Sequence, residues 1–259
     1  MNDPSRTVVI TGAAGHIGRA YALKASMTAS CILIDRDTDP LEAVMASLNT
    51  DAGQSHRIMH CDLIDSAARK SLLDQLTRDE TRIDVLVNNA AFTGSTDLKG
   101  WVAPFEEQSL EAWQGALEVN LTAAFELAQG LSGQLKSSPD GNILNIGSIY
   151  GCLGPDLRLY DNTAMGNPAA YAASKGGLIQ LTRWLATVLA PEIRVNCISP
   201  GGVFRDQPSS FVQAYESRTP LKRMATEADI VGAMMFLTLG ESRYITGQNL
   251  MVDGGFSIW

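Results

Sequence analysis

The chain has 259 residues, of which 45% are hydrophobic and 19% charged, and this balance is that of an ordinary globular protein. Its formal net charge of −8 disfavours nucleic acid and anionic membrane surfaces as partners, because a negative surface repels both. No apolar run is long enough to cross a bilayer and no apolar signal region opens the chain, so we expect a cytoplasmic protein without membrane partners.

Short apolar runs alternate with helix-length amphipathic stretches along the chain. Runs such as Val85–Val87 are apolar at successive positions, so both faces of their sheet must be covered. The pattern predicts an α/β fold, a Rossmann-type doubly wound parallel sheet of about seven strands with helices on both faces. The predicted strands are Thr7–Ile10, Cys31–Ile34, His56–Cys61, Ile83–Val87, Asn142–Ile146, Ile193–Ile198 and Asn249–Val252.

No repeat, low-complexity tract or linker divides the chain, so we expect residues 1–259 to form a single domain. Residues 93–104, 151–168 and 201–208 have irregular compositions rich in Gly, Pro, Asp or Thr. These predicted loops follow strands, and ligands bind at the carboxyl ends of the strands in this class of fold.

The cysteines and histidines do not indicate a metal site, because they lack C-x-x-C or H-E-x-x-H spacing. We expect reduced core thiols and no metal. The residues concerned are Cys31, Cys61, Cys152, Cys197, His16, His56 and His60.

The first predicted strand runs into the glycine turn Thr11-Gly12-Ala13-Ala14-Gly15-His16-Ile17-Gly18 and then into a helix. Glycines here allow the backbone to approach a diphosphate, and the helix N-terminus offers free N–H groups and a positive dipole end. Such turns also connect elements that bind nothing, but the strand-turn-helix context favours a dinucleotide. The candidate cofactor contacts in this turn are Thr11, Gly12, Gly15, His16, Ile17 and Gly18.

The next predicted strand ends at Asp35, 23 positions after Gly12. A carboxylate there would accept hydrogen bonds from the adenosine ribose and repel the 2′-phosphate of NADP, so NAD is the favoured cofactor. The alternative is a solvated strand-end acid. Arg36 follows directly and keeps NADP as the less favoured cofactor.

Tyr171-Ala172-Ala173-Ser174-Lys175 begins a long predicted helix. Tyr171 and Lys175 are four residues apart and share a helix face, so the ammonium is expected to lower the pKa of the phenol and make it a general base. Ser148 follows the strand Asn142–Ile146 and brings a hydroxyl to the same edge of the sheet. Asn120 lies within a helix-length segment, where asparagine predicts a local bend, a bound water or a merely tolerated polar residue.

These motifs, in this order, resemble the short, single-domain branch of the short-chain dehydrogenases/reductases. The resemblance covers essentially the whole chain. It rests on the glycine turn, Cys61-Asp62-Leu63, Asn88-Asn89-Ala90, Asn120, Ser148, the Y-x-x-S-K run at 171–175, Asn196, Pro200-Gly201 and Val252-Asp253-Gly254-Gly255.

The resemblance implies an NAD(P)-binding domain and an oxidoreductase that interconverts a secondary alcohol and a ketone by hydride transfer. Tyr171 would transfer the proton, Lys175 would adjust its pKa and bind the nicotinamide ribose, Ser148 would orient the substrate and Asn120 would hold a relay water. Further implied cofactor contacts are Asp35, Arg36, Asp62 and Leu63 near the adenosine, Asn88 and Ala90 at its ribose, and Pro200, Gly201 and Val203 at the nicotinamide.

Two departures from the family pattern concern the glycine turn and the interval between Ser148 and Tyr171. The turn has G-x-x-G-x-x-G spacing, as in the extended branch, and His16 would contact phosphate or cap the turn. The interval of 23 positions contains an insertion, residues 149–170, which reads either as a substrate flap or as an inter-subunit loop.

The pocket wall is expected to come from this insertion, from Ala91–Trp101 and from a substrate-loop region, residues 201–224. Their polar and aromatic composition favours a sugar or sugar-phosphate alcohol as substrate. Arg158, Arg205 or Arg223 would hold a phosphate, or would instead serve a surface or an interface. The region after Tyr171 also weakly resembles bacterial surface-sugar and flagellin-modification dehydrogenases.

Two alternatives remain at this point. A 3-oxoacyl-thioester reductase is disfavoured by Asp35 and the acidic charge, and a catalytically silent NAD-sensing protein by the presence of Ser148, Tyr171 and Lys175. The resemblance further implies a homo-oligomer, a tetramer or dimer, in which the tail Phe256-Ser257-Ile258-Trp259 is buried against another subunit. The direction of the reaction stays open.

Overall fold

The computed structural model describes residues 6–51, 53–92 and 98–259. Within this part of the chain, seven parallel strands form one sheet in the order β3-β2-β1-β4-β5-β6-β7. The predicted Rossmann-type sheet is therefore confirmed, and the ends of the strands differ from prediction by no more than two residues. The strands are β1 (Thr7–Thr11), β2 (Ser30–Asp35), β3 (Arg57–His60), β4 (Val85–Asn88), β5 (Gly141–Ile146), β6 (Ile193–Pro200) and β7 (Asn249–Val252).

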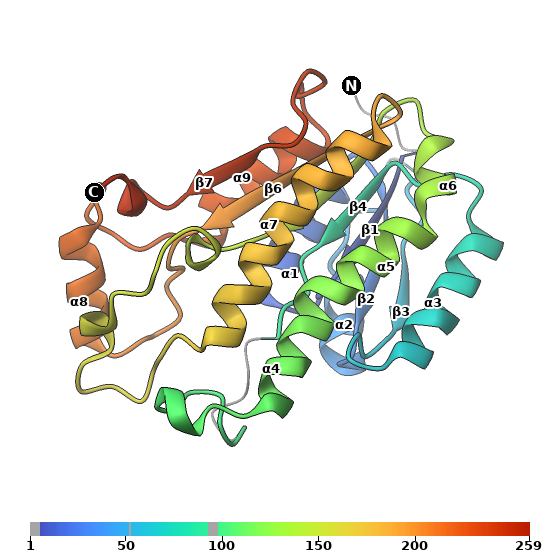
Figure 1. The fold of residues 1–259 in the computed structure, drawn as a ribbon. Coiled ribbons are helices and arrows are strands. Elements are labelled where there is room, and N and C mark those ends of the chain that lie inside the picture. The colour runs from blue at the N-terminus through green and yellow to red at the C-terminus, as the bar shows by residue number, and fades with distance from the viewer. Residues whose placement is uncertain (1–5, 52, 93–97) are drawn as a thin grey trace.

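Helices cover both faces of the sheet (Figure 1). None of the helices in the described ranges is long and apolar enough to cross a membrane. The helices are α1 (His16–Ala25), α2 (Thr38–Met45), α3 (Ser66–Asp79), α4 (Leu110–Leu117), α5 (Ala123–Gly130), α6 (Ser132–Lys136), α7 (Ala169–Leu189), α8 (Ser209–Arg218) and α9 (Glu227–Thr238).

The alternation of side chains along each strand divides the core into two layers. Val8 and Ile10 of β1 pack in the layer of α1 and α9, whereas Val9 packs in the layer of α3, α5 and α7. In β4, Val87 packs in the layer of α1 and α9, and Leu86 packs in the layer of α3, α5 and α7. Because both layers are apolar, the central strands are buried on both faces, as their uninterrupted apolar runs predict.

The prediction of a core position is wrong for one of the four cysteines. Cys31, Cys61 and Cys197 are buried, but Cys152 is exposed. The three buried thiols lie in or next to strands, whereas Cys152 follows a short 3-10 turn, Ile149–Gly151, beyond the carboxyl end of β5. Exposure therefore follows from its place in a loop at the edge of the sheet.

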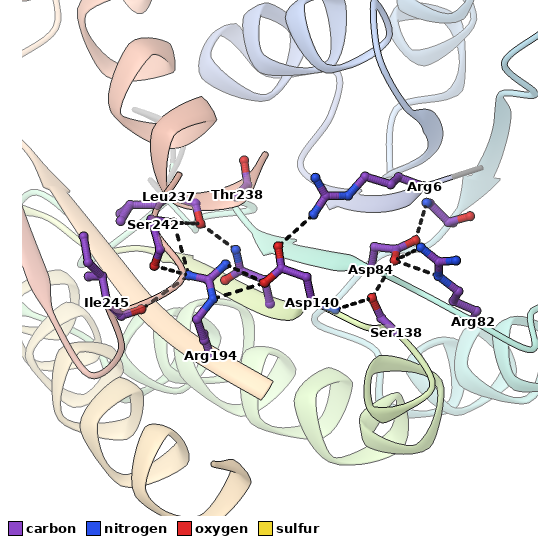
Figure 2. Close-up of polar contacts among 12 residues, drawn as sticks. Arg6, Arg82, Asp84, Ser138, Asp140, Arg194, Leu237, Thr238, Ser242 and Ile245 are labelled. Carbon is purple, nitrogen blue, oxygen red and sulfur yellow. Dashed lines mark hydrogen bonds and ion pairs between the residues drawn. The ribbon is translucent and has the colours of Figure 1, made fainter. Parts of the chain in front are cut away.

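A polar network closes the amino-terminal edge of the sheet (Figure 2). Asp84 precedes β4 and is buried, and its carboxylate accepts hydrogen bonds from the Thr7 backbone N–H at 2.8 Å and from Arg82 Nε at 2.7 Å. The Ser138 hydroxyl donates to the same carboxylate. This buried charge thus has charged and neutral donors around it, as its burial requires.

A second carboxylate extends this network toward β6. Asp140 pairs with Arg6 at 3.1 Å and with Arg194 at 3.4 Å. Arg194 Nη1 also donates to the carbonyl oxygens of Ser242 and Ile245, at 3.1 and 3.3 Å. The network therefore ties the starts of β1, β4, β5 and β6 to the segment after α9.

Candidate active site

The order of the strands creates a crevice at the carboxyl edge of the sheet. From β1 the chain proceeds outward through β2 and β3, and it then returns to the centre and proceeds the other way from β4. The connections that follow β1 and β4 therefore diverge to opposite faces, and in open sheets ligands bind at this switch point. The glycine turn follows β1, so it lies at this crevice.

Close contact with the end of β4 shapes the glycine turn. Gly12 has a φ of +63°, and a Cβ on it would lie 2.7 Å from the Ala90 Cα, so only glycine fits there. Asn89 Nδ2 donates to the carbonyl oxygens of Thr11 and Gly12, at 3.0 and 2.9 Å. Gly15 then caps α1 without a side-chain bond, which leaves the first N–H groups of the helix available to an anion.

Thr11 and Asn88 hold the floor of the crevice. Thr11 Oγ1 accepts hydrogen bonds from the backbone N–H groups of Asn89 and Ala90, each at 3.1 Å. Asn88 Nδ2 donates to Asn145 Oδ1 at 2.9 Å, and within the described residues the buried Asn88 Oδ1 has no hydrogen-bond donor. These residues thus fix the two central strands at their carboxyl ends.

Asp35 lies beside the glycine turn, at the end of β2. Its carboxylate accepts hydrogen bonds from the Ala14 N–H at 2.9 Å and from the Arg36 N–H at 2.8 Å. The Arg36 side chain is exposed and lies 3.8 Å from Asp37. The carboxylate therefore has lone pairs left for a further donor, while the neighbouring guanidinium has a carboxylate partner.

The remaining expected cofactor contacts also lie at carboxyl ends of strands. Asp62 follows β3 and accepts a hydrogen bond from the Ile64 N–H at 3.1 Å, and the carbonyl oxygen of Leu63 accepts one from Arg69. Pro200 ends β6, and the Gly201 N–H donates to a carbonyl of β7. Val203 forms an isolated parallel bridge with Ala225.

The structure brings Ser148, Tyr171 and Lys175 together between β5 and α7. Tyr171 and Lys175 occupy the first two turns of α7, and Ser148, two residues after the end of β5, forms a side-chain hydrogen bond with Tyr171. Lys175 Nζ donates to the carbonyl oxygen of Ile146 at 2.7 Å and lies 5.8 Å from the centroid of the Tyr171 ring. A hydroxyl, a phenol and an ammonium thus share one edge of the sheet.

The pKa of Tyr171 differs in direction from the sequence-based expectation. Burial raises it, and the hydrogen bond with Ser148 opposes this rise only in part. Burial also lowers the pKa of Lys175 to about 8. Burial thus dominates both pKa values, and the Lys175 ammonium donates its hydrogen bond to a backbone carbonyl rather than to the phenol.

Asn120 lies in a π-helical turn, Glu118–Thr122, between α4 and α5. The helix is therefore locally irregular at this asparagine, since a π-helical turn interrupts the α-helical pattern. Asn120 Oδ1 accepts a hydrogen bond from the Phe92 N–H at 2.6 Å, and its Nδ2 donates to Ser174 Oγ at 2.9 Å. The side chain thereby joins the segment after β4 to the helix that carries Tyr171, and its role toward a water stays a prediction.

A family model described as enoyl-(acyl carrier protein) reductase matches residues 12–257. D-threitol dehydrogenase from Mycolicibacterium smegmatis is 31% identical over 265 residues, which cover 98% of this chain and 93% of that protein. This chain belongs to the short-chain dehydrogenases/reductases. As a member of this family, it is an NAD(P)-dependent oxidoreductase.

Other members of the family bear differing names. Post-translational flagellin modification protein A from Campylobacter coli is 29% identical over 98% of this chain and 99% of that one, in agreement with the weak resemblance noted from the sequence. A 3-oxoacyl-[acyl-carrier-protein] reductase from Synechocystis is 30% identical over 97% of this chain and 96% of that one.

Solved structures of the family hold either nicotinamide cofactor. A short-chain dehydrogenase from Leptospira borgpetersenii with bound NAD+ has a TM-score of 0.83 at 35% identity, covering 99% of this chain and 94% of that one. A protein described as an NAD(P)-dependent gluconate 5-dehydrogenase from Beutenbergia cavernae, with NADP at low occupancy, has a TM-score of 0.85 at 33% identity. The match covers 98% of each of these two chains.

The insertion of this dehydrogenase/reductase packs against its own chain. Tyr160 lies 5.5 Å from Phe211 of α8, and Tyr215 of α8 stacks on Phe256 at 4.6 Å. The Tyr150 and Tyr160 hydroxyls are 2.6 Å apart. The expected burial of the whole tail against another subunit therefore needs correction for Phe256, which is buried within its own subunit, whereas the last two residues, 258 and 259, are exposed.

Each arginine expected to hold a phosphate has a carboxylate partner. Arg158 is 82% exposed and lies 2.8 Å from Asp156. Arg223 contacts Asp229 through both terminal nitrogens, at 2.7 Å each. Arg205 lies 2.8 Å from Glu227. Glu227 was not among the residues expected from the sequence, although the T-x-x-D pattern at 226–229 marks it as the start of a helix.

Two cavities flank the chemistry in the described part of the protein. One, of about 160 Å³, lies between the ends of β6 and β7 and is lined in part by Gly201, Tyr215 and Asp253. The other, of about 220 Å³, lies at the starts of α4 and α7 and is lined in part by Trp101 and Trp113. Of the expected wall at 91–101, residues 93–97 lie outside the described residues.

Proposed function

We propose that residues 1–259 form one domain that oxidises a secondary alcohol, or reduces the corresponding ketone, with NAD and a polyol or sugar-type substrate. The observation that carries the proposal is that Ser148, Tyr171 and Lys175 meet at the same carboxyl edge of the sheet as a glycine turn that can accept a diphosphate. A phenol and a hydroxyl at one point can bind the same substrate oxygen. The bound nicotinamide supplies the hydride chemistry.

In this mechanism the chain's own residues position the oxygen and move its proton. Ser148 donates a hydrogen bond to the carbonyl oxygen, and the Tyr171 hydroxyl transfers its proton to that oxygen during reduction and takes it back during oxidation. Lys175 contributes positive charge next to the phenol and is held by the carbonyl of Ile146. Asn120 keeps the helix of Tyr171 in register with the segment after β4.

Asp35 supports NAD over NADP. Its carboxylate lies at the end of β2, tied to the Ala14 N–H of the glycine turn at 2.9 Å. A negative group there can accept hydrogen bonds from the ribose hydroxyls and repels a 2′-phosphate.

The second candidate substrate class is a 3-oxoacyl thioester, because a reductase with this activity is among the relatives. Polyol-type substrates have the support of the D-threitol dehydrogenase relative and of the polar insertion. The net charge of −8 also opposes docking of an acidic carrier protein.

We also propose a homo-oligomer assembled through α4 and α7. Trp184 and Val188 of α7 are 55% and 50% exposed, and Leu110 of α4 is 76% exposed. An apolar face of this kind is typical of a subunit interface. Light scattering on the purified protein tests this, and a monomeric mass at micromolar concentration would contradict it.

The experiment that tests the function follows NADH formation from NAD across polyols, sugars, sugar phosphates and 3-hydroxyacyl thioesters. We expect saturable turnover with a polyol or sugar. Turnover only with thioesters would mean that the substrate is an acyl thioester rather than a polyol or sugar. NADH binding without turnover of any substrate would support the binding-protein alternative.

A further inference from the structure

Three ionisable side chains meet beside the glycine turn. Arg205 Nη1 lies 2.8 Å from Glu227 Oε1, and His16 Nδ1 lies 3.7 Å from the same oxygen. His16 is the first residue of α1, directly after Gly15. The guanidinium of Arg205 is therefore close to the helix terminus at which the diphosphate of the cofactor is proposed to bind.

Backbone pairing places Arg205 opposite Glu227. Val203 and Ala225 form a parallel bridge, in which the Ala225 N–H donates to Gly202 O and the Phe204 N–H donates to Ala225 O, both at 2.9 Å. Two residues further along each segment are Arg205 and Glu227. The bridge therefore brings Arg205 of the loop close to Glu227, the first residue of α9.

The loop that carries Arg205 is held in one conformation by its own hydrogen bonds. Gln207 Oε1 accepts a bond from the Arg205 N–H at 2.7 Å, and Gln207 Nε2 donates to Val203 O at 2.8 Å. Asp206 has a φ of +54°, a conformation that a non-glycine residue adopts at an energetic cost. Such a strained and braced loop fixes the position of its charged side chain.

The guanidinium of Arg205 keeps one edge available for a ligand. Its contacts with the described residues, to Glu227 and to Phe204 O at 2.6 Å, both use Nη1. By contrast, Asp156 occupies Nε and Nη2 of Arg158, and Asp229 occupies both terminal nitrogens of Arg223. An Nε–Nη2 edge matches the spacing of two phosphate oxygens.

We propose that Arg205 binds the diphosphate of the nicotinamide cofactor, rather than the substrate, and that Glu227 holds its guanidinium in place. The inference rests on the proposed cofactor site. Glu227 begins α9 and His16 begins α1, and the contact between their side chains brings two helix N-termini, each with a positive dipole end, close together. The guanidinium balances the charge of the carboxylate, and the helix termini then favour an anion.

The test is the affinity of the purified full chain for NADH, ADP and adenosine, measured by calorimetry and by competition. We expect Arg205→Ala to weaken NADH and ADP at least tenfold and to leave adenosine within twofold, because only the first two carry a diphosphate. Arg78→Ala, which removes an exposed, carboxylate-paired arginine of α3, is the matched control and should change none of the three affinities by more than twofold.

Glu227→Gln separates ligand binding from a purely structural salt bridge. The amide oxygen can still accept a hydrogen bond from Arg205 while the negative charge is gone, so NADH should bind this variant at least as tightly as the wild type. Equal losses of NADH affinity in Glu227→Gln and Arg205→Ala would mean that the salt bridge only braces the loop, and would overturn the proposal.

Other outcomes distinguish this inference from the proposed function. Wild-type protein that binds NADH, together with unchanged NADH affinity in Arg205→Ala, would overturn the inference alone. A raised KM of Arg205→Ala for the alcohol, at unchanged NADH affinity, would show that Arg205 binds the substrate and not the cofactor. Wild-type protein that binds neither NADH nor NADPH would overturn the proposed cofactor site and this inference together.

Discussion

The two edges of the sheet differ in whether the chain itself supplies partners for the polar groups that lie there. At the amino-terminal edge, Asp84 and Asp140 are surrounded by donors from the same chain (Figure 2). At the carboxyl edge, the N-cap Gly15 gives the first turn of α1 no side-chain hydrogen bond, and Asn88 Oδ1 has no donor in the described part of the chain. Lys175 is buried there with a backbone carbonyl as its hydrogen-bond partner. The two carboxylates of the first edge are satisfied by the chain itself, whereas the second edge keeps backbone N–H donors, an acceptor oxygen and a charge available to a ligand.

The largest expected effect concerns the carboxyl edge. Tyr171→Phe should lower kcat by about 10²- to 10⁴-fold, because it removes the hydroxyl that transfers the proton. NADH affinity, measured by fluorescence titration, should stay within twofold. Near-normal turnover in this variant would remove Tyr171 from the proposed mechanism.

The amino-terminal edge should instead govern stability. Asp84→Ala leaves Arg82 and the Thr7 N–H without their buried carboxylate, and we expect the free energy of unfolding to fall by about 3–5 kcal/mol. Urea denaturation measures this, with the exposed Asp74→Ala as control. The kcat of the folded fraction should be unchanged, and a large loss of kcat there would show that the two edges are coupled.

A buried lysine makes the stability of the carboxyl edge depend on pH. The pKa of Lys175 is lowered by burial from 10.5 to about 8. Between these values the unfolded chain holds a proton that the folded chain has released, so the contribution of Lys175 to stability rises with pH across this window. Below pH 8 the buried ammonium lowers the free energy of unfolding by its full amount, on the order of 3 kcal/mol.

Lys175→Met should therefore stabilise the ligand-free protein at pH 7, and this gain should shrink as the pH rises toward 10.5. Urea denaturation of both proteins at several pH values checks the slope. Lys70→Met, on an exposed position of α3, provides the baseline. A difference between Lys175→Met and wild type that does not vary with pH would contradict the assignment of this cost to the buried ammonium.

The smallest expected effect is a change in the relative affinities for NADH and NADPH. Asp35→Ala should weaken NADH about tenfold and strengthen NADPH, because a ribose acceptor and a repulsive charge disappear together. Titration with both cofactors measures the change, and Asp37→Ala serves as a nearby exposed control. An unchanged ratio of the two affinities would reduce Asp35 to a strand-end acid that braces the glycine turn.

Much of the fold could be predicted because its signals are local. Uninterrupted apolar runs identify β1 and β4, and Asn120, a poor helix former, marks the π-helical turn. The direction of the pKa of Tyr171 could not be predicted, because it depends on burial by segments that are distant in sequence. The pairing of Arg205 with Glu227 likewise arises from a bridge between two separate loops.

The aromatic contacts around α8 have a consequence for how such enzymes diverge. Tyr160 of the insertion, Phe211 of α8 and Phe256 of the tail belong to one packed cluster, and Tyr150 of the same cluster lies two positions after Ser148. Substitutions of residues in contact do not add independently. A chimera that takes the tail of a relative is therefore expected to be stable only when α8 and the insertion come from the same relative.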